Sequence, residues 1–225
     1  MPHLLYFVPT SGYDAAERER RLQVMRPLLA PGFTVDFLTL LGTPEFLDQA
    51  SDFDAAKRAG LAAIGSISSE QCAAVIEGGA LDPGLQELRA AARVPVIGPG
   101  EASLFVARLL GQRLSIITVD EHAVAATRTM VREVRERPEV VSIRSMNTPV
   151  RRIVSNLEAG RAALRREAEA AVREDGADVV YLGSMTLPTL GITAELRRQL
   201  GVPIIDPLAV ALHTAQAVAL AKATG

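Results

Sequence analysis

The chain has 225 residues, a length typical of one large domain or two small ones. Hydrophobic residues make up 48% of the sequence and charged residues 22%, which excludes a disordered or collagen-like chain. The net charge of -2 leaves no basic surplus for binding nucleic acid or an anionic membrane. We therefore expect a small-molecule partner, and neither nucleic acid nor a membrane among the partners.

The sequence contains one cysteine, Cys72. A single cysteine excludes an intramolecular disulfide and a cysteine-cluster metal site, and it is typical of a reducing compartment. The N-terminal segment carries no basic leader, and its apolar run is too short for a signal peptide or a membrane span. The sequence therefore predicts a cytoplasmic protein.

Short apolar runs alternate along the chain with longer segments of helical period. The runs are rich in Val, Ile and Leu and predict strands at residues 4–8, 33–41, 73–76, 94–97, 114–119, 140–143, 179–182 and 202–205. The segments of helical period predict helices at 14–29, 54–66, 83–92, 102–110, 121–137, 155–175, 194–200 and 209–222. This alternation predicts an α/β fold with parallel sheets covered by helices on both faces. In such sheets, functional residues lie just after the carboxyl ends of the strands.

The chain also contains an internal repeat. Residues 74–85 align with residues 179–190, and each block is followed by an E-L-R triplet and a V-P-[VI]-I-x-P segment. Gly79 then corresponds to Ser184. The repeat predicts two similar three-layer α/β half-domains related by a pseudo-two-fold axis, with the active site in the cleft between them. We expect the first half to comprise residues 1–98 with 207–225, and the second half residues 99–206.

The motifs that carry this pattern resemble the aspartate/glutamate racemase superfamily, and most closely its hydantoin racemase branch. They are P-T-S at 9–11, G-T-P at 42–44, D-F-D-A-A at 52–56, L-D-P-G-L at 81–85, P-V-I-G at 95–98 followed by Glu101, L-S-I-I-T at 114–118, L-G-S at 182–184 and G-V-P-I-I-D at 201–206. The resemblance covers nearly the whole chain. It implies a cofactor-independent enzyme in which a substrate carbon lies between the two half-domains.

The sequence departs from this family at the two catalytic cysteines. In such racemases, a cysteine after the central strand of each half moves the proton at the stereocentre, and the corresponding residues here are Gly79 and Ser184. Cys72 precedes its strand, so it cannot replace either cysteine, and we interpret it as a small buried residue. Racemisation by two cysteines is therefore excluded.

The two catalytic candidates are Glu77 and Ser184. Glu77 ends an apolar run, and burial there would raise its pKa into the range useful for acid-base catalysis. The alternative for Glu77 is a side chain that turns outward into a salt bridge or caps a loop. For Ser184, which lies outside any G-x-S-x-G motif, hydrogen bonding to substrate is favoured over covalent catalysis.

Further residues after the predicted strands are candidates for substrate binding, each with a structural alternative. Backbone donors of Gly78, Gly79, Gly183 and Met185 could hold an anion or simply form tight turns. The hydroxyls of Thr10 and Ser11 suit a carboxylate or imide oxygen, or a helix cap. His122 follows a strand end, and Arg151 and Arg152 suit a substrate carboxylate, although all three are also compatible with a solvated surface. We interpret Glu101 as a helix N-terminal acid.

The leading hypothesis is hydrolysis of a small five-membered cyclic amide, a hydantoin- or thiohydantoin-like ring that bears a carboxylate. Glu77 would activate water to attack a ring carbonyl or thiocarbonyl carbon, and Ser184 with the Gly78 and Gly79 backbone would hold the developing anion. One alternative is carbon-acid chemistry, either racemisation or decarboxylation, with a base other than cysteine. The other is a catalytically silent binding protein.

Cofactors and metals are not expected. The sequence has no zinc-ligand spacing, no Walker loop and no G-x-G-x-x-G motif that opens a helix. The apolar final helix is compatible with burial within one chain or in a homo-oligomer.

Overall fold

The structure is a computed structural model that describes residues 2–47, 49–135 and 137–223. The chain divides into two compact units, one built from Met1–Pro99 with Leu208–Gly225 and the other from Gly100–Pro207. Each unit contains a four-stranded sheet. Within the described residues, no helix is both long enough and apolar enough to cross a membrane.

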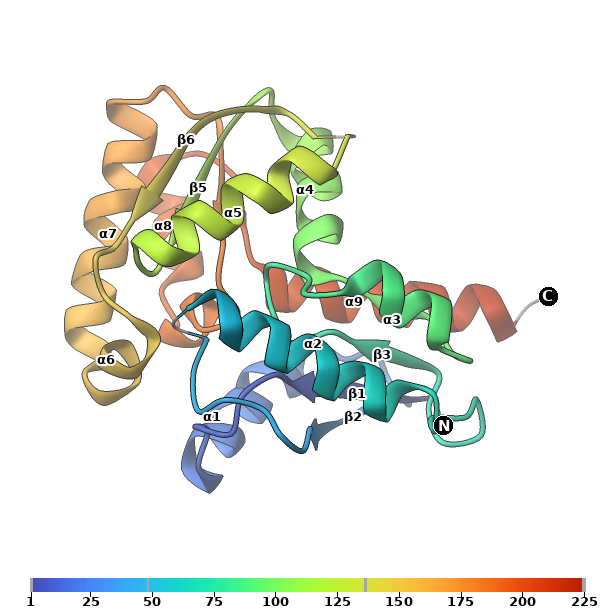
Figure 1. Cartoon of the computed structure of the whole chain (residues 1–225). Coiled ribbons are helices and arrows are strands. Elements are labelled where there is room, and N and C mark those ends of the chain that lie inside the picture. The colour runs from blue at the N-terminus through green and yellow to red at the C-terminus, as the bar shows by residue number, and fades with distance from the viewer. Residues whose placement is uncertain (1, 48, 136, 224–225) are drawn as a thin grey trace. The chain divides into compact units, whose positions relative to one another are not determined.

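The first unit is a parallel sheet with helices on both faces. Its strands pair in the order β2-β1-β3-β4, with bounds β1 (His3–Val8), β2 (Thr34–Thr39), β3 (Ala74–Ile76) and β4 (Val96–Ile97). Its helices are α1 (Ala15–Met25), the 3-10 helix η1 (Arg26–Leu28), α2 (Ala50–Ile64), α3 (Leu85–Ala91) and α9 (Pro207–Ala223), which starts at the unit boundary. In Figure 1, α1 lies on one side of β1 and β2, and α2 and α3 lie on the other.

Local sequence signals explain the start of α1 and the packing of this unit. The side chain of Asp14 accepts a hydrogen bond from the backbone N–H of Glu17 at 2.8 Å and caps the helix. Ser11 was an alternative for this cap, and that alternative is wrong because Asp14 occupies the position. The core between the sheet and α2 and α3 includes Phe7, Leu40, Ile64, Val75, Leu85 and Leu88.

Helix α9 is attached to the first unit although it follows the whole of the second unit in the chain. Gln216 is 5% exposed. Its side-chain oxygen accepts a hydrogen bond from Ala30 N at 2.5 Å, and its amide nitrogen donates to Leu28 O at 3.1 Å. These bonds connect α9 to the segment between η1 and β2, so the first unit needs residues from both ends of the chain.

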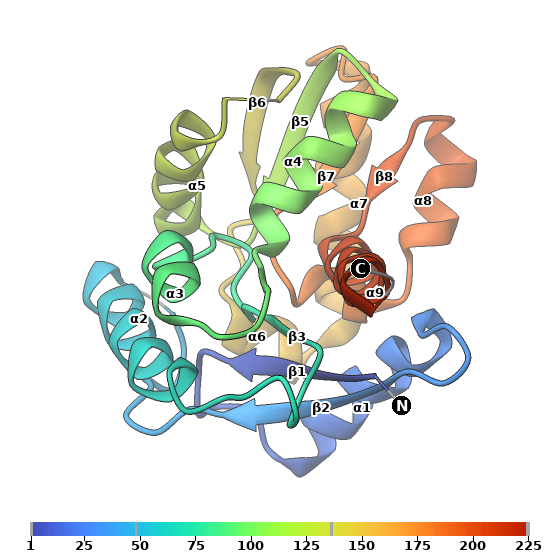
Figure 2. The ribbon, with the colours of Figure 1, turned by 90° about the vertical axis from the view of Figure 1, so that its right-hand side faces the viewer.

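The second unit repeats the topology of the first. Its strands pair in the order β6-β5-β7-β8, again all parallel, as Figure 2 shows, with bounds β5 (Arg113–Thr118), β6 (Glu139–Ser145), β7 (Val179–Leu182) and β8 (Ile204–Ile205). Its helices are α4 (Pro99–Leu110), which starts at the unit boundary, α5 (Glu121–Glu133), α6 (Val150–Ser155), α7 (Leu157–Arg173), the 3-10 helix η2 (Leu187–Leu190) and α8 (Thr193–Leu200). The equal strand order in both units agrees with the internal repeat.

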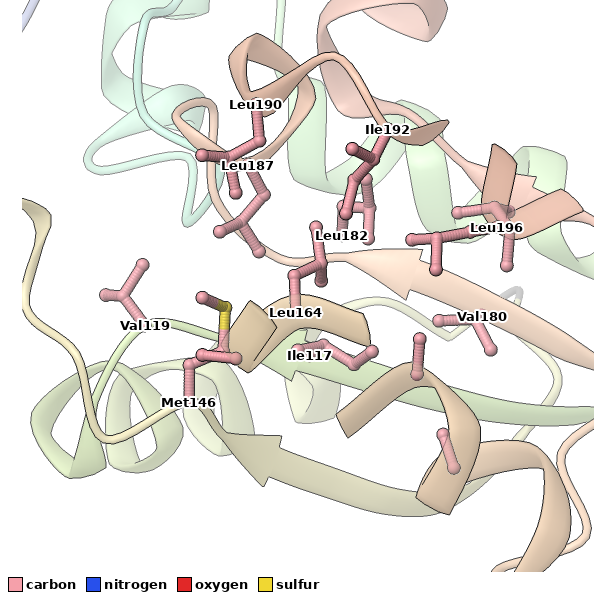
Figure 3. Packing of buried hydrophobic residues seen from close by; sticks show 14 of the residues in the cluster. Ile117, Val119, Met146, Leu164, Val180, Leu182, Leu187, Leu190, Ile192 and Leu196 are labelled. Carbon is pink, nitrogen blue, oxygen red and sulfur yellow. The ribbon is translucent and has the colours of Figure 1, made fainter. Parts of the chain in front are cut away.

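The core of the second unit lies between its sheet and helices α7 and α8. Figure 3 shows Ile117, Val180 and Leu182 from the sheet among apolar side chains of the helices that cover it. Leu182 and Leu164 are fully buried. The internal repeat aligns Leu182 of this unit with Glu77 of the first unit.

The predicted parallel α/β fold is confirmed, and all eight predicted strands are present, with ends within two residues of the predicted ones. The short helices α6 and η2 were not predicted. Helix α6 has six residues and buries only Ile153, so it is too short to show a helical period. Helix α5 ends at Glu133, four residues earlier than predicted.

Candidate active site

The carboxyl end of β3 carries a buried carboxylate. Glu77 directly follows Ile76, the last residue of β3, and its backbone N–H still donates to Ile97 O of β4 at 2.9 Å. The Glu77 side chain is 4% exposed. One of its oxygens, Oε2, accepts a hydrogen bond from the backbone N–H of Gly79 at 2.7 Å. The carboxylate therefore folds back over the loop that follows its own strand.

The surroundings of Glu77 raise its pKa well above the ordinary value for glutamate. Burial is the main cause, the negative charge of Asp82 raises it further, and the hydrogen bond from Gly79 opposes both. Among the described residues, no basic side chain forms an ion pair with Glu77. A buried carboxylate with a raised pKa is suited to take up and release a proton near neutral pH.

Two glycines bring the backbone close to this carboxylate. A Cβ at Gly78 would lie 1.7 Å from the carbonyl oxygen of Phe7, so only glycine fits there. A Cβ at Gly79 would lie 3.2 Å from Glu77 Oε2 and 3.1 Å from Pro83 Cδ. Glu77 thus places its carboxylate beside the point where a side chain of residue 79 would begin. The resemblance to racemases assigns a catalytic cysteine to this position.

The loop after β1 supplies polar groups at the same edge of the first sheet. Thr10 is 4% exposed, and its hydroxyl has no hydrogen-bond partner among the described residues. A buried hydroxyl without a partner is unfavourable unless a ligand or water satisfies it. Ser11 is exposed, and its backbone N–H donates to Pro44 O at 2.8 Å. Of the two predicted residues, Thr10 is therefore the better placed for substrate.

The carboxyl end of β7 is the equivalent edge of the second sheet. Gly183 donates its N–H to Ile117 O at 2.7 Å, and its carbonyl oxygen accepts from Thr118 Oγ1 at 3.3 Å. Ser184 is half-buried between the buried residues Gly183 and Met185. Its Oγ accepts a hydrogen bond from Thr186 N at 3.3 Å. Within the described part of the chain, no basic group bonds to the Ser184 hydroxyl.

The remaining predicted binding residues lie on the surface. His122 is the second residue of α5 and is exposed, and Arg151 and Arg152 are exposed in the first turn of α6. None of the three is buried beside Ser184. Glu101 lies in the first turn of α4, where an acid stabilises the positive end of the helix dipole.

Sequence reasoning missed the buried residues Tyr6 and Arg21 and the half-buried Asp82, whose charge acts on Glu77. Tyr6 on β1 donates its hydroxyl hydrogen bond to Gly78 O at 3.1 Å. Arg21 on α1 is 2% exposed, and its guanidinium carbon lies 4.1 Å from the centre of the Tyr13 ring. Asp82 has a positive φ of 51°. The signal for Asp82 was the turn sequence D-P-G, whereas Tyr6 and Arg21 gave no signal because their neighbours in sequence are ordinary strand and helix residues.

The buried position of Cys72 agrees with its interpretation as a structural residue. It is 2% exposed, belongs to the core of the first unit and precedes β3. Burial raises the pKa of its thiol, which makes the reactive thiolate less available. No group of three or more His, Cys, Asp or Glu side chains in the described part of the chain could hold a metal ion.

We expect Cys72→Ser to leave kcat nearly unchanged and to lower stability by about 1 kcal/mol, because a hydroxyl is buried in an apolar core. Steady-state kinetics and thermal unfolding of the purified variant measure the two effects. A folded variant whose kcat falls by orders of magnitude would mean that Gly79 and Ser184 are not the positions that correspond to the family's cysteines.

Known proteins show the same fold. An allantoin racemase from Klebsiella pneumoniae superposes with a TM-score of 0.88 at 22% identity over 99% of this chain and 89% of that chain. An allantoin racemase from Pseudomonas fluorescens superposes with a TM-score of 0.85 at 24% identity over 98% of this chain and 92% of that chain. At 22% and 24% sequence identity, these superpositions show that the fold is shared.

Sequence comparison identifies the family. The hydantoin racemase of Pseudomonas sp. (strain NS671) is 31% identical over 137 residues, which cover 61% of this chain and 54% of that protein. The match thus spans about half the length of this relative. The family model described as Asp/Glu/Hydantoin racemase matches residues 19–215. Because this match covers most of the chain, including Glu77 and Ser184, the chain belongs to the Asp/Glu/hydantoin racemase family.

Proposed function

We propose that this protein is a cofactor-independent isomerase in which Glu77 exchanges a proton with a carbon acid. The observation that carries the proposal is the buried Glu77 carboxylate, which accepts the Gly79 N–H at 2.7 Å. This carboxylate lies beside the position where the family has a catalytic cysteine. A buried carboxylate can act as the base there in place of a thiolate, because burial makes it a stronger base than an ordinary glutamate.

The proposed step is removal of a proton from a carbon next to a carbonyl group. The ionised Glu77 takes the proton, and the electrons of the C–H bond move into the carbonyl to form an enolate. Hydrogen-bond donors stabilise the negative charge that develops on the carbonyl oxygen. A proton supplied by water to the opposite face of the carbon restores the C–H bond with inverted configuration, and protonated Glu77 releases its own proton to solvent, which regenerates the carboxylate. No substrate bond other than C–H is broken, and no cofactor is required.

The proposed substrate is a hydantoin-like ring. The relatives named above are racemases of hydantoins and of allantoin, and all belong to or share the fold of this family. In such a ring the acidic carbon lies next to a carbonyl group, as the proposed step requires. The buried Thr10 hydroxyl without a partner is a candidate donor to a ring oxygen. A carboxylate on the substrate remains a proposal that depends on Arg151 and Arg152.

Ser184 is proposed as a hydrogen-bond donor to the substrate. Its Oγ accepts from Thr186 N at 3.3 Å, which leaves its own proton available. We expect Ser184→Ala to lower kcat/KM about 10- to 100-fold, the scale for loss of a donor to a developing charge. A nucleophilic serine would cost far more activity. Steady-state kinetics of the folded variant separate the two roles, and full activity would exclude both.

Hydrolysis of the ring is a second candidate, favoured by the difference between the two sheet edges. Glu77 provides a buried base at the first edge, whereas Ser184 has no bonded base at the second. A single base is enough to activate water, but two-sided racemisation needs a second proton donor. The relatives are racemases, which favours isomerisation over the hydrolysis that the sequence alone put first.

A panel of hydantoins and thiohydantoins in deuterated water tests both candidates. NMR and optical rotation follow each compound with and without the protein. Deuterium entry at the ring carbon with loss of optical rotation supports the isomerase, and ring opening or sulfide release supports hydrolysis. No reaction with any compound, combined with measurable binding, would contradict both and indicate a binding protein.

A further inference from the structure

One peptide group connects Tyr6 to Glu77. The carbonyl of Gly78 and the N–H of Gly79 belong to the same planar amide. The Tyr6 hydroxyl donates to that carbonyl oxygen at 3.1 Å, and that N–H donates to Glu77 Oε2 at 2.7 Å. A hydroxyl, a peptide group and a carboxylate therefore form a continuous chain of two hydrogen bonds.

The strand register and packing hold Tyr6 in place. Tyr6 pairs with Ile76 of β3, the residue before Glu77, and its ring contacts Phe37 edge-on at a centroid distance of 5.2 Å. The side chain is 2% exposed. Burial raises the pKa of the Tyr6 hydroxyl, so the group stays protonated and acts as a donor at any pH relevant to Glu77.

A comparison of equivalent positions in the two units relates Tyr6 to Glu77. The equivalent positions in the second unit hold Ile116, which pairs with Tyr181 of β7, and Leu182. A Cβ at Gly183 would approach Ile116 Cγ2 at 2.8 Å, just as a Cβ at Gly78 would approach Tyr6 Cε1 at 2.9 Å. The unit with a carboxylate after its central strand thus has a tyrosine on the neighbouring strand, and the unit with leucine has isoleucine.

We propose that Tyr6 is a positioning residue whose hydroxyl, acting through the Gly78–Gly79 peptide group, holds the Gly79 N–H on the Glu77 carboxylate. The proposal rests on the proposed role of Glu77 as the base. Donation to the carbonyl oxygen fixes the orientation of the peptide plane and polarises its N–H, which strengthens the second bond of the chain. This bond stabilises ionised Glu77 more than protonated Glu77, because a carboxylate is a stronger hydrogen-bond acceptor than a carboxylic acid.

Other charged and titratable groups surround this chain of bonds and remain in place when the Tyr6 hydroxyl is removed. From α1, buried Arg21 acts on Tyr6 and is itself paired with Glu17 at 2.7 Å, and Tyr13 lies against Arg21. From the loop after β3, Asp82 acts on Glu77. Tyr6 and Glu77 also act on each other directly, so a change in Glu77 titration is assigned to the peptide group only if the Gly79 amide proton signal changes with it.

The test is Tyr6→Phe, with the Glu77 carboxyl followed by carbon-13 NMR as a function of pH. We expect the pKa of Glu77 to rise by about half a unit or more, because ionised Glu77 loses a well-oriented donor. The midpoint of the rising limb of kcat/KM against pH should move upward by the same amount. A merely structural role of Tyr6 would lower stability without moving either midpoint.

The second unit supplies the matched control. Thr118→Val removes a buried hydroxyl that donates to Gly183 O at 3.3 Å, the counterpart of the Tyr6 bond, but no carboxylate lies beyond it. This variant should leave the Glu77 titration unchanged. In the unmodified protein, the Gly79 amide proton and the Tyr6 ring carbon that bears the hydroxyl should both titrate with the midpoint of Glu77, a measurement that does not depend on the variant folding.

The outcomes separate this proposal from the proposed function. If Tyr6→Phe folds and Glu77 titrates as in the unmodified protein, or if the Tyr6 carbon does not follow Glu77, the positioning role is wrong whatever the activity. If Glu77→Gln keeps full activity while Tyr6→Phe still shifts the Glu77 titration, the catalytic role of Glu77 is wrong and the positioning role of Tyr6 stands.

Discussion

Glu77→Gln is expected to lower kcat about 100-fold or more, the usual scale of general acid-base catalysis. Glutamine preserves the size of the side chain and can still accept the Gly79 N–H, but it cannot take up a proton. In the unmodified protein the rate should rise with pH through a midpoint well above the ordinary glutamate pKa, because burial and Asp82 raise the pKa of Glu77. Steady-state kinetics over a pH series measure both effects.

Glu77→Gln should also make the folded state more stable, although it lowers kcat. Because the pKa of Glu77 is raised on folding, the folded state binds more protons than the unfolded state between the ordinary and the raised pKa. Stability therefore falls as pH rises through this window. Glu77→Gln removes that loss, so its melting temperature should exceed that of the unmodified protein increasingly as pH rises above about 4.3, the ordinary glutamate pKa.

The exposed Glu70 gives a matched control, since Glu70→Gln makes the same chemical change outside the buried site. It should leave the pH dependence of the melting temperature nearly as it is. A folded Glu77→Gln protein with unchanged kcat would remove Glu77 from the mechanism. Carbon-acid chemistry would then need another base, with His122 as the first candidate.

Gly78→Ala is expected to destabilise the first unit by about 3 kcal/mol or more, beyond the usual cost of overpacking. The added Cβ would lie 1.7 Å from Phe7 O and 2.8 Å from Pro9 Cδ, so the loop must leave its position. A loss of this size lowers the melting temperature by about 6 °C or more in a chain of this length. Thermal unfolding by circular dichroism measures it.

Gly79→Ala is the matched control for Gly78→Ala. Its Cβ would lie 3.1 Å from Pro83 Cδ and 3.2 Å from Glu77 Oε2, contacts that a shift of a few tenths of an ångström relieves. This variant should fold with a much smaller loss of stability and yet lower activity, because it displaces the Glu77 carboxylate. Equal melting temperatures for the two variants would contradict the close packing of Gly78.

The sequence predicts the fold well because its signals are local and repeated. The apolar runs are short and bounded by turn residues, and the repeat predicts two sheets of the same topology, which the strand orders β2-β1-β3-β4 and β6-β5-β7-β8 confirm. Burial was one of two interpretations of Glu77 at the end of an apolar run, and the structure agrees with it, while the bond from the Gly79 N–H also fits the alternative of a loop cap. What the sequence could predict was the position of the carboxylate along a strand.

The partners of Glu77 could not be predicted, because they depend on contacts between separate strands and loops. Tyr6 lies in an apolar run, where a tyrosine is as ordinary as a phenylalanine, and its hydroxyl has meaning only once β1 and β3 are paired. Arg151 and Arg152 show the opposite case. Their pattern suited a substrate carboxylate, but the unpredicted helix α6 leaves both exposed.

The first unit begins before the second unit in the chain, but its last helix is synthesised after the second unit. The second unit is one continuous segment, Gly100–Pro207, whereas the first also needs residues from Leu208 onward. A ribosome therefore finishes the second unit before it makes α9, and until then Leu28 and Ala30 lack Gln216. Domains usually fold in the order in which they are made. Here the first unit, whose sheet carries Glu77, gains its last helix only after the whole of the second unit has been made.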